Sequence, residues 1–199
     1  MTVLVASNNA HKLEEIRPYL PGVRLESPTE AGLAFEYEET GGDFVSNALG
    51  KAMALYRLAG IPTLADDSGL CVDALGGRPG VLSARYGSPD GSATLSSPER
   101  NALLLSEMRG CTDRICRFVC CLALVLTPDR VFIVQETCEG VLLDEPQGSG
   151  GFGYDPIVFL PALGRSVAEL DSAEKNAVSH RGRALARMSA VMDSLGRQA

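Results

Sequence analysis

Carboxylates are concentrated in two short segments of the chain, Glu38-Glu39-Thr40-Gly41 and Ala65-Asp66-Asp67-Ser68-Gly69-Leu70. Adjacent carboxylates repel each other and are costly to bury without a cation. Oxygen-rich sites of this kind suit Mg²⁺, which keeps several water ligands and is completed by the phosphates of a substrate. An aspartate-rich turn and an acidic helix start are the ordinary structural alternatives. The two segments therefore indicate a Mg²⁺ site, and they leave open whether Glu38 or Glu39 supplies the ligand.

The amino terminus has the pattern of a phosphate-binding turn. Thr2 to Ala6 is an apolar, β-branched run that predicts a buried strand. Ser7-Asn8-Asn9 follows, and Ala10 to Leu20 has the apolar spacing of a helix. A strand, a small polar turn and a helix aim backbone N–H groups and the helix dipole at an anion, which Lys12 could also reach. Neither usual glycine-rich nucleotide fingerprint is present, so an ordinary helix cap is the alternative.

A third irregular segment runs from Gly150 to Pro156. Its clustered glycines cost chain entropy unless a ligand or a positive φ requires a bare backbone. Phe152 and Tyr154 stand among them, and the following proline restricts Asp155 to an extended or turn conformation. Aromatic faces beside exposed amides and a fixed carboxylate suit a flat, hydrogen-bonding ligand such as a purine base. The alternative is a glycine-rich turn between strands with two core aromatics.

The composition of the chain agrees with a compact soluble enzyme. With 199 residues, of which 45% are hydrophobic, the chain can bury one sizeable core. The net charge of −7 argues against nucleic acid as a partner, because binding to a phosphate backbone needs a basic face. A nucleotide is still compatible, since Lys12, Lys51, Lys175 and Arg181 could form a local positive pocket. The structural alternative is that the lysines lie on solvent-exposed helix faces and bind no ligand.

Several features of the sequence favour a cytoplasmic setting. We expect no secretory leader before the first strand, and no apolar run approaches the ~20 residues of a membrane helix. The six cysteines lack the C-x-x-C spacing of a zinc site. Cys120-Cys121 lies within the apolar run Phe118 to Leu126, so at least one of the pair should be buried. We therefore expect reduced, structural cysteines, and neither a membrane nor a nucleic acid as a partner.

The spacing of apolar residues predicts a mixed α/β fold with one long mixed sheet. Strands are expected at Ile61 to Ala65 and, after a tight turn, at Leu70 to Ala74. Ile115 to Leu126 and Arg130 to Thr137 should form a hairpin around Thr127-Pro128-Asp129. Helices are expected at about Asp43 to Ala59, from Ser97-Pro98 to about Met108, and at about Arg181 to Leu195, with Ser97 as the cap of the second helix. Short strands are expected at Val141 to Leu143 and at Ile157 to Phe159.

Taken in order along the chain, these segments resemble the inosine triphosphate pyrophosphatase family, the XTP/dITP diphosphatases that remove aberrant purine nucleoside triphosphates. The resemblance runs from residue 2 to about residue 195. One departure is Asn8, where many members have a glycine, and another is Asn176-Ala177-Val178. The matching segments are Ser7 to Lys12, Glu38 to Gly41, Phe44 to Lys51, Ala65 to Leu70, Leu75 to Gly80, Ser83 to Tyr86, Gly150 to Pro156, Ala168 to Leu170, Glu174-Lys175 and Ser179 to Gly182.

The resemblance implies a single domain over residues 1–199, built on an elongated central mixed β-sheet flanked by helices, with an active-site cleft between two lobes. It also implies a homodimer that hydrolyses nucleoside triphosphates between the α and β phosphates, with Mg²⁺ as cofactor. Glu39 and Asp67 would hold Mg²⁺, and Asp66 would support the metal shell. Asp67 would also activate the attacking water, as the proton acceptor of the family does.

Substrate contacts follow from the same resemblance. Three lysines would neutralise the phosphates, and the amino-terminal turn would cradle them. Donors from His180 and Arg181 would hydrogen-bond to the 6-oxo group of hypoxanthine and xanthine. Adenine has a 6-amino group at the same position, which is itself a donor and could not accept these hydrogen bonds. The full set of implied substrate contacts is Ser7, Asn8, Asn9, Ala10, His11, Lys12, Lys51, Ser68, Phe152, Gly153, Tyr154, Asp155, Lys175, His180 and Arg181.

Two other functions are compatible with parts of this pattern. A Maf-like pyrophosphatase that acts on modified pyrimidine nucleotides would open with a comparable strand, but it would follow that strand with a Ser-x-Arg-Arg type of turn, and this chain has Ser-Asn-Asn-Ala-His-Lys instead. A nucleotide-binding regulator without turnover is the second alternative. Glu39, Asp66 and Asp67 argue against it, because a mere binder gains nothing from carboxylates that face a triphosphate.

Overall fold

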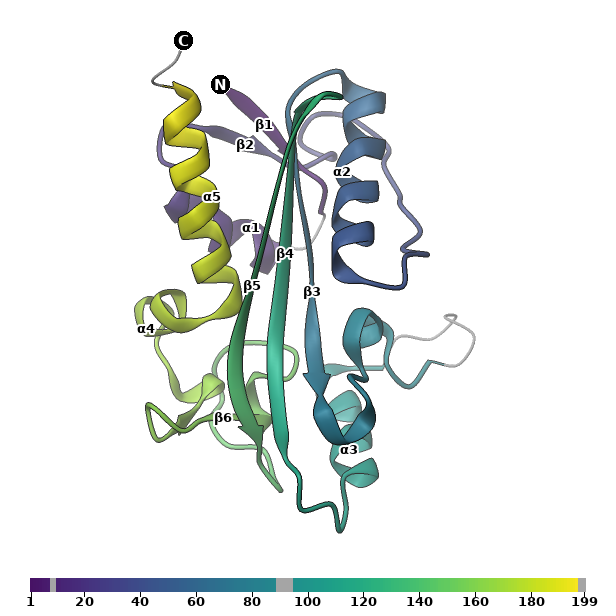
Figure 1. The fold of residues 1–199 in the computed structure, drawn as a ribbon, viewed down its shortest axis with the longest axis vertical. Helices are drawn as coiled ribbons and strands as arrows, with labels where there is room; N and C mark the ends of the chain where they lie inside the picture. Colours follow the sequence, from purple (N-terminus) through teal and green to yellow (C-terminus); the bar gives the residue numbers. More distant parts are fainter. Residues whose placement is uncertain (8–9, 89–94, 197–199) are drawn as a thin grey trace. The chain divides into compact units, whose positions relative to one another are not determined.

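Seven strands of the described chain form one mixed sheet, in the order β2-β1-β3-β4-β5-β6-β7 (Figure 1). The structure is a computed structural model that describes residues 1–7, 10–88 and 95–196. The two strand pairs that include β1 are parallel, and the pairs β5–β6 and β6–β7 are antiparallel. The mixed α/β fold expected from the sequence is therefore confirmed. The strands are β1 (Thr2–Val5), β2 (Arg24–Glu26), β3 (Thr63–Val72), β4 (Ile115–Thr127), β5 (Arg130–Leu142), β6 (Val158–Leu160) and β7 (Arg165–Ser166).

The described chain divides into two compact units. One comprises Met1–Asp67, Cys120–Glu136 and His180–Ala199, and the other comprises Ser68–Val119 and Thr137–Ser179. The expected cleft between two lobes, and the expectation of a single domain over residues 1–199, stay predictions. Among the residues described, no helix has the length and apolar character that a membrane crossing requires.

Helices of the first unit begin and end at residues that favour such boundaries. α2 (Phe44–Ala59) has Asp43 as its N-cap, whose carboxylate accepts a hydrogen bond from the Ser46 backbone N–H at 2.7 Å. It ends at Gly60 in the left-handed conformation that glycine adopts easily. α1 (Ala10–Ile16) passes into a 3₁₀ turn that contains Pro18, which cannot continue the helical hydrogen bonds. The third helix of this unit is α5 (His180–Gly196).

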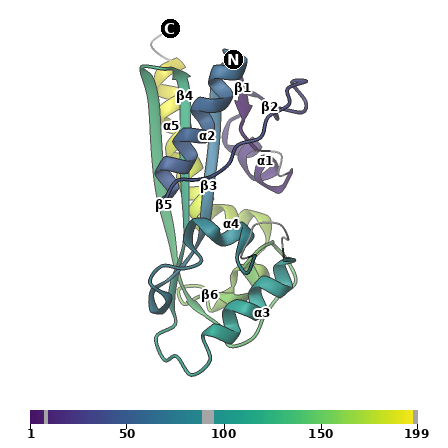
Figure 2. The same ribbon diagram turned by 90° about the vertical axis from the view of Figure 1, so that its right-hand side faces the viewer.

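Alternate residues of β4 supply two cores on the two faces of the sheet in the first unit, because successive strand side chains point to opposite faces. Cys120, Leu122 and Leu124 pack in a cluster with buried residues of α1 and α5. Cys121, Ala123 and Val125 pack in another with the buried face of α2. Figure 2 accordingly has α2 on the near side of the strands and α5 on the far side. Both neighbouring cysteines are therefore core residues, as the apolar run around them predicts.

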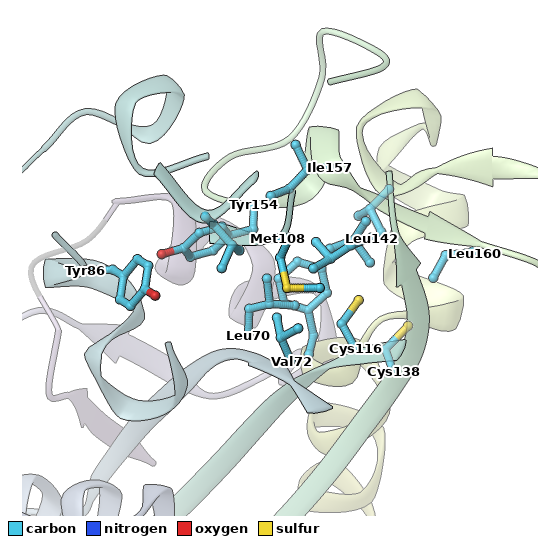
Figure 3. Packing of buried hydrophobic residues seen from close by; sticks show 14 of the residues in the cluster. Leu70, Val72, Tyr86, Met108, Cys116, Cys138, Leu142, Tyr154, Ile157 and Leu160 are labelled. Atoms are coloured by element: carbon cyan, nitrogen blue, oxygen red, sulfur yellow. The ribbon is translucent and has the colours of Figure 1, made fainter. Parts of the chain in front are cut away.

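The second unit has its own hydrophobic core beneath α3 (Ser97–Glu107) and beside α4 (Ser172–Val178). Figure 3 shows Leu70, Val72, Met108 and Leu142 gathered in this core. Ser96, and not Ser97 as expected, caps α3, in a reciprocal capping box with Glu99.

The expected tight turn at Asp66 to Gly69 is wrong, because β3 runs unbroken from Thr63 to Val72. Gly69 suggested a turn, but its φ is not positive and its role is close packing. A Cβ atom there would lie 2.3 Å from the Gly80 carbonyl oxygen and 2.4 Å from Ser83 Oγ. Ser83 Oγ also accepts a hydrogen bond from the Leu70 backbone N–H. The short strand expected at 141–143 likewise belongs to the long β5.

Replacing Gly69 with alanine should therefore lower the free energy of unfolding, by about 1–3 kcal/mol as is typical of overpacking. The backbone carbonyl of Gly80 cannot rotate away from the added methyl group as a flexible side chain would. Gly42→Ala is the matched control, because a Cβ there meets nothing within 4 Å and its φ is not in the left-handed region. Urea unfolding of both variants measures the difference, and equal stabilities would show that Gly69 is not needed for packing.

Candidate active site

Asp67 is a buried carboxylate with an unsatisfied oxygen. It lies on β3, is only 4% exposed, and its Oδ2 has no hydrogen-bond partner among the described residues. Burial and the nearby Glu39 carboxylate raise the pKa of Asp67 to about 6, against the opposing effects of Lys51, Asn47 and Lys12. A buried polar atom without a partner is uncommon in a native structure. This oxygen is therefore a candidate ligand atom.

Glu39 and Lys51 form an ion pair next to a pocket. The pocket has a volume of about 490 Å³, and its lining includes both residues of the pair. Its other lining residues are Ala6, Ser7, Phe35, Glu36, Tyr37 and Glu38. Ser7 and the acidic segment, which are far apart in the sequence, thus line the same pocket, as a joint phosphate and metal site requires.

Asp66 has surroundings unlike those of Asp67. Neighbouring strand residues point to opposite faces, and the Asp66 carboxylate is fully buried beside two cations. Lys12 Nζ lies 2.5 Å from Oδ1, and Arg181 Nε lies 2.8 Å from Oδ2. Burial alone would raise the pKa of Asp66, but the charges of Arg181 and Lys12 outweigh it and hold that pKa well below its usual value. Asp66 is thus ionised and engaged with protein cations.

Two of the predicted phosphate-binding lysines converge. Lys12 Nζ and Lys51 Nζ donate to the same backbone carbonyl oxygen, that of Asp66, at 3.2 and 3.3 Å. Lys12 comes from α1 and Lys51 from α2, so two helices bring their charges to the strand that carries Asp67. Such a pair of ammonium groups can hold the oxygens of a polyphosphate.

The donor set at Asp67 fits a magnesium ion. No group of three or more histidine, cysteine, aspartate or glutamate side chains is arranged for a metal within the described part of the chain. Mg²⁺ does not need one, because one or two carboxylates with waters and substrate phosphates suffice. Asp67 Oδ2 is buried without a hydrogen-bond partner in the described residues, so an acceptor is left for a hydrated ion or substrate.

The predicted base-binding segment forms a local network within the second unit. Lys175 Nζ lies 2.9 Å from Asp155 Oδ2 and 4.3 Å from the centroid of the Phe152 ring. The Phe152 backbone N–H also donates to Asp155 Oδ2, at 2.8 Å. A Cβ atom on Gly151 would lie 2.2 Å from the same oxygen. The glycine therefore allows the Asp155 carboxylate to approach the backbone.

Tyr154 differs from the aromatic surface that the sequence suggested. Its ring is buried in the core of the second unit, where Figure 3 places it near Met108, and its hydroxyl donates to the Ser83 carbonyl at 2.9 Å. The ring is therefore a core side chain, and the predicted contact of Tyr154 with the substrate stays a prediction. The neighbouring Gly153 carbonyl accepts a hydrogen bond from Asn101.

His180 and Arg181 are both buried at the start of α5. Arg181 donates to Asp66 and, through Nη1, to Glu15 at 2.5 Å. Ser68 directly follows Asp67 on β3 and is half-buried. Of the other predicted contacts, Asn8 and Asn9 lie outside the described residues, as do the side chains of Ala10 and His11.

Three residues of this site were not predicted from the sequence. Glu15 lies one helical turn after Lys12, and that spacing is a signal that could have suggested a shared face. Asn47 lies in the first turns of α2, and its side-chain oxygen accepts a hydrogen bond from the Gly41 backbone N–H. The Cys120 sulfur lies 3.4 Å from Asp66 Oδ2. No sequence pattern indicates either contact, because both depend on how separate elements pack.

Comparison with known proteins gives consistent matches over nearly the whole chain. The model of the Ham1 family matches residues 3–191. A dITP/XTP pyrophosphatase of Treponema denticola is 49% identical over 185 residues, which cover 93% of this chain and 95% of that protein. A dITP/XTP pyrophosphatase of Ralstonia nicotianae is 47% identical over 189 residues, which cover 94% of each chain.

Solved structures give the same result for the fold. A Ham1 protein from Coxiella burnetii superposes with a TM-score of 0.89 at 38% identity, covering 98% of this chain and 99% of that one. The Staphylococcus aureus Ham1 protein superposes with a TM-score of 0.88 at 32% identity, with the same coverage.

Proposed function

We propose, because the chain belongs to the Ham1 family, that it hydrolyses dITP, ITP and XTP to the nucleoside monophosphate and pyrophosphate. Such an activity would clear the nucleotide pool and keep deaminated purines out of DNA and RNA. The observation that carries this proposal is the buried Asp67 carboxylate with its unsatisfied Oδ2, which feels the charge of Glu39 and directly follows the Asp66 carbonyl on which Lys12 and Lys51 converge. A carboxylate pair and two ammonium groups are what a metal-assisted reaction of a polyphosphate requires.

We assign the metal to Glu39 and Asp67. Bound Mg²⁺ would neutralise phosphate charge and so make the anhydride easier to attack. Lys12 and Lys51 would bind the remaining phosphate oxygens, and Ser7 lines the same pocket as Lys51. Lys51 now pairs with Glu39, so substrate binding would let it exchange that carboxylate for phosphate.

Asp67 is our candidate for the general base. Burial and Glu39 raise its pKa to about 6, so at neutral pH it is ionised and yet more basic than an ordinary aspartate. A base with a pKa near the working pH combines the correct protonation state with a useful affinity for the proton. As the base, the Asp67 carboxylate would accept the proton of the attacking water.

Selectivity for the base would come from donors that match a 6-oxo group. His180 and Arg181 remain our candidates, because adenine would place an amino group against the same donors. A site built on buried hydrogen bonds can reject a mismatched substrate by ~10⁴-fold, which shape alone does not give. The roles of Phe152, Gly153, Asp155 and Lys175 in holding the base or phosphates are proposals of the same kind, as are a cytoplasmic setting and a homodimer.

The products of ITP hydrolysis test the position of cleavage. We expect IMP and pyrophosphate in equal amounts when the enzyme is incubated with ITP and Mg²⁺ and the products are separated by ion-exchange chromatography. The reason is that the metal and lysine site can hold two phosphates together as a leaving group. IDP with orthophosphate would instead place the cleavage at the terminal phosphate and contradict the proposal.

A further inference from the structure

We propose that Asp66 is a positioning residue and not a metal ligand: it holds Lys12 and Arg181 in the arrangement in which they meet the nucleotide. This inference rests on the function proposed above, because it concerns residues assigned to phosphate and base. It differs from the role that the sequence suggested for Asp66. The argument starts from the contacts of its carboxylate.

Both oxygens of the Asp66 carboxylate are occupied by donors from the protein. Lys12 Nζ lies 2.5 Å from Oδ1, while Arg181 approaches Oδ2 with Nε at 2.8 Å and Oδ1 with Nη2 at 3.5 Å. The Cys120 thiol lies 3.4 Å from Oδ2. The carboxylate is 0% exposed and Arg181 is 2% exposed. A metal ion at Asp66 would have to displace Lys12 or the buried Arg181 and would be repelled by the cation that stayed.

The donors come from three different elements. Lys12 belongs to α1, Arg181 to α5 and Cys120 to β4, while Asp66 itself lies on β3. Arg181 also pairs with Glu15, which is on α1 three residues after Lys12. Asp66 thus connects two helices and a neighbouring strand at one point. Long cationic side chains have many rotamers, and a fixed counter-charge reduces their freedom.

Adjacent residues of β3 therefore have separate tasks. Asp66 faces the cations and organises them, while Asp67 faces Glu39 and carries the chemistry. Removing Asp66 should then disturb nucleotide binding even when no metal is present. Removing a metal ligand would instead change the concentration of Mg²⁺ that the enzyme needs.

The test compares Asp66→Asn with wild type in two measurements. The first is calorimetric binding of IMP and of inorganic pyrophosphate in EDTA, and the second is the Mg²⁺ concentration for half-maximal ITP hydrolysis. We expect IMP and pyrophosphate to bind roughly tenfold more weakly or worse, as loss of a charged contact implies, with the Mg²⁺ requirement unchanged within about twofold. Asp73→Asn is the matched control, since that aspartate pairs with Arg117 in the other unit, and it should change neither measurement.

Metal-free binding by Asp66→Asn that equals or exceeds that of wild type, together with a raised Mg²⁺ requirement, would overturn the proposal. So would wild-type enzyme that binds neither ligand in EDTA. If Asp66→Asn does not fold, the double variant Asp66→Asn/Arg181→Gln is used instead, because it removes one charge of each sign and so leaves no unpaired Arg181 charge. It should bind pyrophosphate more weakly than Arg181→Gln alone, and equal binding would contradict the role. Failure of wild type to release pyrophosphate from ITP would refute only the proposed function.

Discussion

Replacing Asp67 with asparagine should lower kcat for ITP by roughly 10²–10⁴-fold, the range associated with loss of a general base. The amide has nearly the same shape, but it is a poor base and a weaker ligand for Mg²⁺. Steady-state pyrophosphate release measures the effect over a range of Mg²⁺ concentrations. Near-full activity with an unchanged Mg²⁺ requirement would exclude Asp67 both as base and as ligand.

The same variant should be more stable than wild type at neutral pH when no metal is present. The pKa of Asp67 is raised in the folded state to about 6, from an ordinary value of 3.8. The folded protein therefore binds more protons than the unfolded chain between about pH 4 and 6, and its stability falls as the pH rises through that window. A pKa raised from 3.8 to about 6 corresponds to about 3 kcal/mol of stability.

The stability difference between Asp67→Asn and wild type should therefore grow from about pH 4 to pH 7, by up to about 3 kcal/mol. Urea unfolding in EDTA at several pH values measures it. Since the comparison is a difference between two nearly identical proteins, the other titrating groups largely cancel. A difference that does not change with pH would show that burial of Asp67 does not disfavour its charged form.

Replacing Glu39 with glutamine should raise the Mg²⁺ concentration for half-maximal activity at least tenfold. Glu39 supplies one of the two carboxylates of the proposed metal site, and its charge acts on Asp67. Mg²⁺ binds few protein carboxylates, so each contributes a large part of the affinity. Mg²⁺ titration of ITP hydrolysis measures the change, and saturating Mg²⁺ should restore part of the activity.

Glu38→Gln is the matched control for this experiment. Glu38 is the adjacent residue, carries the same charge and also lines the pocket. It is exposed, however, whereas burial and the charge of Glu39 raise the pKa of Asp67. Its variant should need no more Mg²⁺ than wild type. A larger rise in the Mg²⁺ requirement for Glu38→Gln than for Glu39→Gln would show that our account assigns the metal to the wrong glutamate.

Much of the fold could be predicted because local signals and tertiary packing agree. The apolar run at Phe118 to Leu126 predicted a central strand, and the capping aspartate and terminal glycine of α2 mark its ends. The break at Asp66 to Gly69 was predicted wrongly because turn-forming residues usually mark turns. Here Gly69 permits close contact with the Gly80 carbonyl instead, a reason that becomes visible only when both segments are in place.

The site was less predictable than the fold. Asp66 and Asp67 are neighbours in sequence, so they suggested one shared metal site, but the pleat of the strand separates their surroundings. The partner of Asp66 on α5 is 115 residues away in sequence, and that on β4 is 54 residues away. Tyr154 shows the same limit, since a buried aromatic and a base-stacking aromatic have identical sequence signals.

The most direct measurement of the central claim is pyrophosphate release by wild-type enzyme from ITP, XTP, dITP, ATP, GTP and dUTP, each with Mg²⁺ at one pH. We predict that kcat/KM for ITP, XTP and dITP exceeds that for ATP by at least ~10²-fold, because adenine lacks the 6-oxo acceptor that the proposed hydrogen-bonding site requires. Guanine also carries a 6-oxo group, so a lower kcat/KM for GTP would have to come from its 2-amino group. Preference for dUTP would indicate a pyrimidine house-cleaning enzyme of the Maf-like kind. Binding of ITP without turnover would indicate a regulator, and either result would contradict the proposed function.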